Sequence, residues 1–207
     1  METTTALWSF ALVVGLLTLT PGLDTALVLR TSALGRRRQA WGVVLGIQTG
    51  TLIWGTLTSA GVTALLTASH VAYEVLRWAG AAYLVWMGVG MLRDRGARAV
   101  DAAEPTTEGG FGHGWRRGTL TNLLNPKVGV FYVAVLPQFI PAGAPHFAAG
   151  VALTCVHVAE GLLWSTVLVG FARVLRGWLR RPAARRVMDR VTGAVVLGFG
   201  VKLALAD

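Results

Sequence analysis

The chain has 207 residues, of which 54% are hydrophobic and only 14% are charged, whereas a soluble domain carries about 25% charged residues. Its mean hydropathy is +0.57, which excludes an ordinary soluble domain and indicates an integral membrane protein. The net charge of +9 does not indicate a nucleic-acid partner, because the arginines stand between apolar runs and form no basic face with interleaved aromatic residues.

Length and scarcity of charge predict an all-α membrane protein with six transmembrane helices. The predicted spans cover about residues 6–33, 40–68, 71–92, 119–140, 146–171 and 187–205. The first of them has no Lys or Arg before its apolar run, unlike a secretory signal peptide. We therefore expect it to be retained as a membrane helix.

The basic residues predict the orientation of these spans. Seventeen of the 19 Lys and Arg residues fall on the first, third and fifth connections and their edges, and only Arg77 and Lys202 fall elsewhere. The seventeen are Arg30, Arg36, Arg37, Arg38, Arg93, Arg95, Arg98, Arg116, Arg117, Lys127, Arg173, Arg176, Arg180, Arg181, Arg185, Arg186 and Arg190. Because cytoplasmic loops carry an excess of Lys and Arg, this alternation predicts that both termini lie outside.

The middle of the chain divides it into two halves. Residues 93–117 are rich in Gly, Pro, Thr and acids and show no apolar periodicity, which is typical of a cytoplasmic linker. Residues 1–92 and 118–207 then each hold three spans, and an odd number inverts the second half relative to the first. Inverted three-helix repeats of this kind are a recurring design of transporters.

Two spans are interrupted by proline. Thr20-Pro21-Gly22 breaks the first and Asn125-Pro126 breaks the fourth. Each break reads as a capping residue followed by proline at the first helical position, so we expect a new half-helix to begin at each. Lys127 adds a positive charge at the second break, and Asp24 adds a negative charge near the first.

These charges predict a site for a zwitterion. The Asn125–Lys127 side suits a carboxylate, because the start of a helix is partly positive, and the Asp24 side suits an ammonium group. The alternatives are that Asp24 and Lys127 pair with each other, or that Lys127 extends to the cytoplasmic interface. Gln48, beside a stripe of Gly42, Gly46 and Gly50, and Tyr132, after the second break, are further candidate substrate contacts.

His157 and Glu160 are three residues apart in the fifth span and so are placed on one helix face. Because histidine titrates near neutrality, this pair and Asp24 are candidates for carrying a coupling proton. Interhelical hydrogen bonding, or exposure to a wet vestibule, is the alternative role for the pair. The candidate substrate-binding residues are Pro21, Gly22, Asp24, Gln48, Asn125, Pro126, Lys127 and Tyr132.

The sequence predicts no cofactor, no metal site and no enzyme. Cys155 is the single cysteine, and no His/Cys cluster of metal-ligand spacing accompanies it. No nucleophile elbow, phosphate-binding glycine loop or paired acid motif stands in the spans. A membrane scaffold or assembly partner without transport activity is the remaining alternative to a transporter.

Two motifs resemble the signatures of the LysE/RhtB amino-acid exporters. TPGLD at residues 20–24, with SALGRRRQAWGVVLGIQTG at 32–50, is similar to the first, and NPKVGVFYVAVLPQFI at 125–140 is similar to the second. The matching positions are Pro21, Gly22, Asp24, Gly35, Arg37, Gly46, Asn125, Pro126, Lys127, Pro137 and Gln138. The family usually has proline where Leu23 stands. With leucine there, this chain lacks one rigid position at the first break.

This resemblance implies a multi-pass protein of the bacterial inner membrane. It implies export of amino acids or close derivatives from the cytoplasm, driven by the proton motive force. The expected partners are an amino-acid substrate, protons and the lipid bilayer, and whether the chain forms a homo-oligomer stays open.

Overall fold

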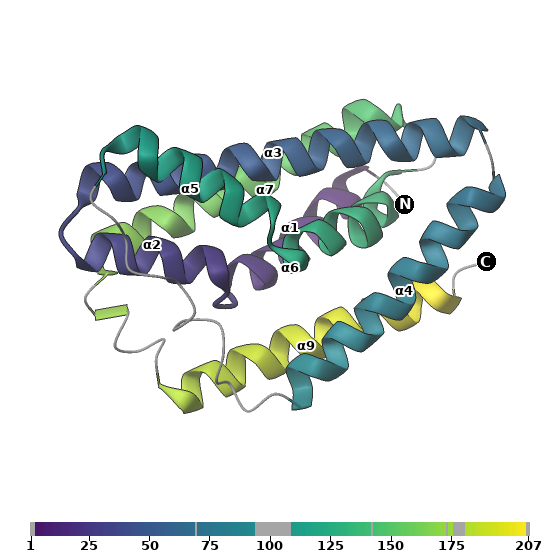
Figure 1. Cartoon of the computed structure of the whole chain (residues 1–207). Helices are drawn as coiled ribbons and strands as arrows, with labels where there is room; N and C mark the ends of the chain where they lie inside the picture. The colour runs from purple at the N-terminus through teal and green to yellow at the C-terminus, as the bar shows by residue number, and fades with distance from the viewer. Residues whose placement is uncertain are drawn as a thin grey trace.

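The computed structural model describes residues 3–68, 70–93, 109–141, 143–172, 174–175 and 181–205. Within these ranges the chain is helical and has no strand, as the composition predicts. Figure 1 shows two groups of helices. Helices α4 (His70–Arg93) and α9 (Pro182–Leu205) lie side by side as one antiparallel pair, and the remaining helices form the second group.

The first predicted span is a broken helix. Helix α1 (Thr3–Leu19) and helix α2 (Leu23–Ala33) are bent by 53° at residues 20–22. The prediction that Thr20 caps the second half is wrong, because Gly22 is the N-cap and the Thr20 hydroxyl donates back to the Leu16 carbonyl at 2.7 Å. Thr20 therefore ends α1, and Pro21 separates the two helices.

Glycines let helix α3 (Arg37–Ala68) pack closely on helix α5 (Phe111–Leu123). A Cβ added to Gly42 or Gly46 would collide with the carbonyl oxygens of Phe111 or Trp115. The stripe of Gly42, Gly46 and Gly50 therefore serves helix packing. Because residue numbers rise together along this contact, α3 and α5 run parallel.

We expect Gly46→Ala to destabilise this contact. The added methyl group must push α5 away, which costs about 1–3 kcal/mol of the free energy of unfolding for an overpacked core position. Gly61→Ala in the same helix is the matched control, because nothing lies within 4 Å of a Cβ added there. Thermal unfolding in detergent should show a lower midpoint for Gly46→Ala alone, and equal midpoints would contradict the packing argument.

The fourth predicted span is also broken, and it changes helical type. Helix α6 (Pro126–Val130) is followed by a π-helix η1 (Phe131–Val135) and a 3₁₀ helix η2 (Leu136–Phe139). The Asn125 side chain accepts from the Lys127 backbone N–H at 3.1 Å, so the predicted cap and the proline at the first position are confirmed. Residues 111–117, assigned to the linker by the sequence pattern, are helical.

Helix α7 (His146–Gly170) completes the group and runs antiparallel to α3, with Gly150 against Ser59 and Gly161 against Gln48. By length and hydropathy, Arg37–Ala64 and His146–Gly170 each suffice to cross a membrane, and Thr4–Leu19 with Leu23–Ala33 adds a third, bent span within the described residues. The six-span count and the inverted halves stay predictions. Residues 94–108 of the linker lie outside the described residues.

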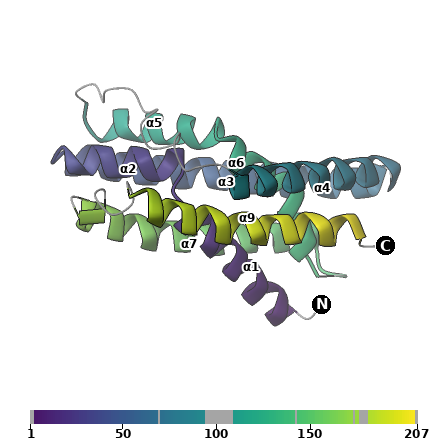
Figure 2. The ribbon, with the colours of Figure 1, turned by 90° about the horizontal axis from the view of Figure 1, so that it is seen from below.

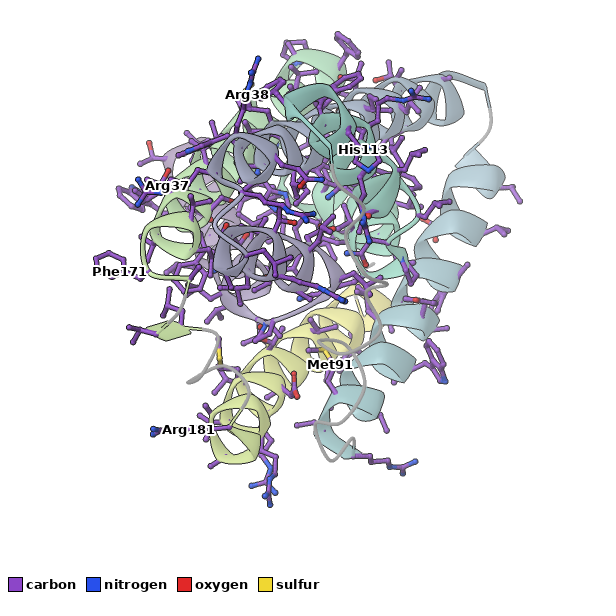
Figure 3. All side chains as sticks on the ribbon, turned by 60° about the vertical axis from the view of Figure 1, so that its left-hand side comes forward. Arg37, Arg38, Met91, His113, Phe171 and Arg181 are labelled. Atoms are coloured by element: carbon purple, nitrogen blue, oxygen red, sulfur yellow. The ribbon has the colours of Figure 1, made fainter. Side chains whose placement is uncertain are left out.

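The arginine-bearing ends of the helices gather at one end of the molecule. Figure 3 looks toward that end, where Arg37 and Arg38 at the start of α3 and Arg181 just before α9 point outward. Figure 2 shows the long helices running along a common direction, with α1 diverging toward the N-terminus. The charged end and the apolar walls fit a bundle that crosses a bilayer.

Candidate functional site

A cavity of about 80 Å³ lies where the two broken spans meet α3 and α7. It brings together six of the residues that the sequence singled out, namely Gly22, Asp24, Gln48, Asn125, Lys127 and His157. The other lining residues are Leu17, Thr18, Thr20, Thr25, Val28, Ile47, Thr51, Asn122, Val128, Gly161, Trp164, Ser165 and Leu168. The site is therefore assembled from segments far apart in the chain.

Asp24 stands in the first turn of α2, where the partial positive charge of the helix start favours a carboxylate. Its Oδ2 accepts a hydrogen bond of 2.9 Å from the Asn122 side-chain amide of α5. Its Oδ1 is buried and has no hydrogen-bond partner among the described residues. Asn122 thus holds one carboxylate oxygen in place while the other stays available to a ligand.

Lys127 is bound to the end of α1. Its ammonium donates to the carbonyl oxygens of Leu17 at 2.9 Å and Thr20 at 3.2 Å. These carbonyls belong to the last turn of α1 and the break, where the helix leaves acceptors unpaired and favours a cation. An ammonium group has three N–H donors, so two bonds leave one for a further acceptor. Asp24 and Lys127 therefore line one cavity but hydrogen-bond to different partners.

Further polar atoms around the cavity lack partners within the described ranges. They are Thr18 Oγ1, Asn122 Oδ1 and Trp164 Nε1. Asn122 Oδ1 lies against α3, where a Cβ added to Gly50 would come within 2.6 Å of it. Buried polar atoms are nearly always hydrogen-bonded, so unpaired ones that border a cavity indicate a place for water or a polar ligand.

His157 lines the cavity, and Tyr132 packs against the His157 ring on the side away from the cavity. The Tyr132 hydroxyl lies 2.9 Å from His157 Nδ1, and the two rings are stacked with centroids 5.7 Å apart. Tyr132 belongs to the π-helix, is fully buried and does not line the cavity. A π-helical turn often marks a functional position, and here it places the tyrosine against the histidine. The structure thus places Tyr132 behind the cavity wall, and the substrate contact stays a prediction.

Three other candidates also stand outside the cavity lining. Pro21 lies in the α1–α2 break, and Pro126 lines a second, mostly apolar cavity of about 370 Å³ beside α4. Glu160 lines a groove of about 270 Å³ between α1 and α7. His157 and Glu160, predicted to share a helix face, therefore line different spaces. No group of three or more potential metal ligands occurs within the part of the chain that the structure describes.

Several lining residues were not predicted from the sequence. Asn122, Thr18, Thr51, Ser165 and Trp164 were not among the predicted substrate contacts. Asn122 could have been predicted from the sequence, because a side-chain amide three residues before the Asn125 cap is unusual in an apolar span. No sequence feature marks the Thr and Ser residues as lining residues, since Thr and Ser are common in membrane helices for packing.

The comparisons with known proteins agree with the resemblance seen in the motifs. The family model described as LysE type translocator matches residues 5–207. The chain is 32% identical to the homoserine/homoserine lactone efflux protein of Salmonella typhi, over 96% of this chain and 97% of the relative. It is 29% identical to the threonine efflux protein of Escherichia coli K12, over 91% and 92%. No solved structure matches it.

Proposed function

The chain belongs to the LysE type translocator family, and from that premise we propose that it exports a small neutral amino acid from the bacterial cytoplasm, driven by the proton motive force. Family membership makes the chain a multi-pass translocator of the bacterial membrane, and the efflux-protein relatives support an amino acid as its cargo. The observation that carries the proposal is one cavity lined by an acid with a free oxygen, Asp24, and a base with a free donor, Lys127.

The two charges define the proposed pose of the cargo. Its ammonium group binds Asp24 Oδ1, and its carboxylate binds the remaining N–H of Lys127. Gln48, Asn125 and the hydroxyl groups of the lining supply neutral polar contacts. Gly22, Pro21 and Pro126 act by shaping the two breaks that expose these groups.

The lining favours a neutral side chain. Among the described lining residues, Asp24 and Lys127 are the charged pair, and His157 is the other titratable group. A basic amino acid would bring a second cation with no carboxylate to receive it, and an unpaired buried charge costs several kcal/mol. The small volume of the cavity also favours a short side chain. Homoserine and threonine, which the relatives are named for, satisfy both conditions.

We also propose the inverted arrangement of two three-helix halves, with both termini outside. Two observations support it: each proposed half begins with a broken span, and both breaks border the same cavity. Transporters of this design place the substrate between the broken helices of the two repeats.

The proposed function is tested by transport from preloaded cells. We expect cells that produce the protein to export L-threonine, L-homoserine or another short neutral amino acid faster than cells with an empty vector. L-lysine should not be exported, and a protonophore should abolish the difference. The measurement is the amino-acid content of the medium against time. Export of nothing in a panel of amino acids would contradict the proposal and favour a scaffold role.

A further inference from the structure

The groove between α1 and α7 has mostly apolar walls and holds one acid. Gly15 and Leu19 of α1 and Leu163 and Val167 of α7 form most of its walls, and Glu160 reaches into it. Leu163 is 71% exposed and Leu19 is 42% exposed, so the groove opens on the outer side of the bundle. In a membrane-spanning bundle that side meets lipid and not water.

One oxygen of the Glu160 carboxyl group has no partner in this groove. Its Oε2 is buried and makes no hydrogen bond within the described residues. It lies against the backbone of α1, since a Cβ added to Gly15 would stand 3.3 Å from it. A carboxylate without a partner costs several kcal/mol to bury, and such groups in general bind a proton instead.

No other titratable side chain lines the groove among the described residues. Helix α1, which faces Glu160, contributes none over Thr3–Leu19, and η2 contributes none over Leu136–Phe139. The titratable groups on the other elements packed against α7 are Asp24 and Arg30 of α2 and Arg37 and Arg38 of α3. On α7 itself, His157 lines the cavity and its Nδ1 is engaged by Tyr132.

Thr18 and Trp164 connect the groove to the cavity. Both residues line both spaces, so their side chains form the wall between them. Thr18 Oγ1 and Trp164 Nε1 are both buried without partners within the described residues. The cavity and the groove therefore share a wall that carries two unpaired polar atoms.

We propose that Glu160 carries the coupling proton in a site separate from the amino-acid cavity, an inference that rests on the proposed function. A proton from outside binds the Glu160 carboxylate, and it leaves to the cytoplasm as the carrier returns for the next amino acid. No other bond forms or breaks, and the amino acid moves outward as the proton moves inward. Proton and cargo then occupy neighbouring sites and do not compete for Asp24.

The test compares exchange with gradient-driven transport in proteoliposomes. Glu160→Gln keeps the shape of the side chain and cannot bind or release a proton. We expect it to exchange labelled against unlabelled amino acid at equal pH as the wild type does. Transport driven by a pH gradient should fall by about tenfold or more, the range of a typical coupling between two sites, and the linked proton flux should disappear.

Glu74→Gln is the matched control, because it makes the same change on α4, away from the cavity and the groove. It should retain both activities. Gradient-driven transport and proton flux that persist in Glu160→Gln would overturn the inference and move the proton to Asp24 or His157. Loss of exchange together with coupling would overturn it as well. A wild type that moves no amino acid would overturn the proposed function, and the inference with it.

A second measurement does not depend on the variant folding. Apolar carbodiimides modify protonated carboxyl groups in apolar surroundings, so they should label Glu160 in the unmodified protein. Peptide mass spectrometry should place the label at Glu160, with more label at lower pH and correspondingly less gradient-driven transport. Labelling elsewhere with none at Glu160 would overturn the inference.

Discussion

Asp24→Asn should strongly reduce export at low substrate concentration while leaving the protein folded. The substituted side chain keeps an oxygen that can accept from Asn122, so the contact between α2 and α5 survives. Its amide nitrogen then occupies the position of the free Oδ1 and presents N–H donors to an incoming ammonium group. Loss of one partner of a buried charged hydrogen bond costs about 2–5 kcal/mol, so we expect the transport rate at low substrate to fall by about 30-fold or more.

The measurement is initial efflux rate against internal amino-acid concentration in proteoliposomes. The loss should appear in the apparent KM, because the interaction forms when the substrate binds. Asp24→Glu, which keeps the charge and moves it by one methylene group, should retain part of the activity. Equal rates for Asp24→Asn and the wild type would show that Asp24 does not bind the substrate, and would not contradict the transport function. A thermal midpoint close to that of the wild type would show that the variant is folded.

The breaks in the spans were predictable because proline and its neighbours act locally. Pro126 after Asn125 gave the α6 start correctly, since a capping side chain and a proline need no tertiary partner. The same rule misplaced the start of α2, because the Thr20 hydroxyl has a competing acceptor in the Leu16 carbonyl and also contacts the Thr192 hydroxyl of α9. The sequence alone does not reveal that second partner.

Which side chains line the cavity depends on helix packing, and helix packing was less predictable from the sequence. An α-helix turns by about 100° per residue, so residues three apart are about 60° from alignment. On α7 that angle is enough to turn His157 toward the cavity and Glu160 toward the groove. Asn122 enters the site because α5 approaches α3 closely at Gly50, a consequence of two helix surfaces that no local pattern encodes.

Lys127→Met should reduce both export and stability, unlike Asp24→Asn. The methionine side chain preserves length and apolar packing but removes the ammonium group from the Leu17 and Thr20 carbonyls. Two acceptors at the end of α1 then lose a charged donor, and hydrogen bonds to charged groups are worth about 1.5–3 kcal/mol each. We expect a clear fall in the thermal midpoint and a loss of export of about tenfold or more, from the missing carboxylate contact.

The double variant Asp24→Asn with Lys127→Met separates two roles for the lysine. If Lys127 served mainly as the counter-ion of Asp24, removing both charges would leave no unpaired charge, and the double variant would be more stable than Lys127→Met alone. The hydrogen bonds of the structure predict the opposite, because Asp24 is held by Asn122 and Lys127 by the end of α1. Because each side chain makes its main hydrogen bonds to a different helix, we expect the double variant to melt no higher than Lys127→Met. Recovery of the midpoint in the double variant would make the two residues an ion pair. A midpoint no higher than that of Lys127→Met would show that Lys127 mainly stabilises the end of α1. In that position its third N–H stays within reach of a substrate carboxylate.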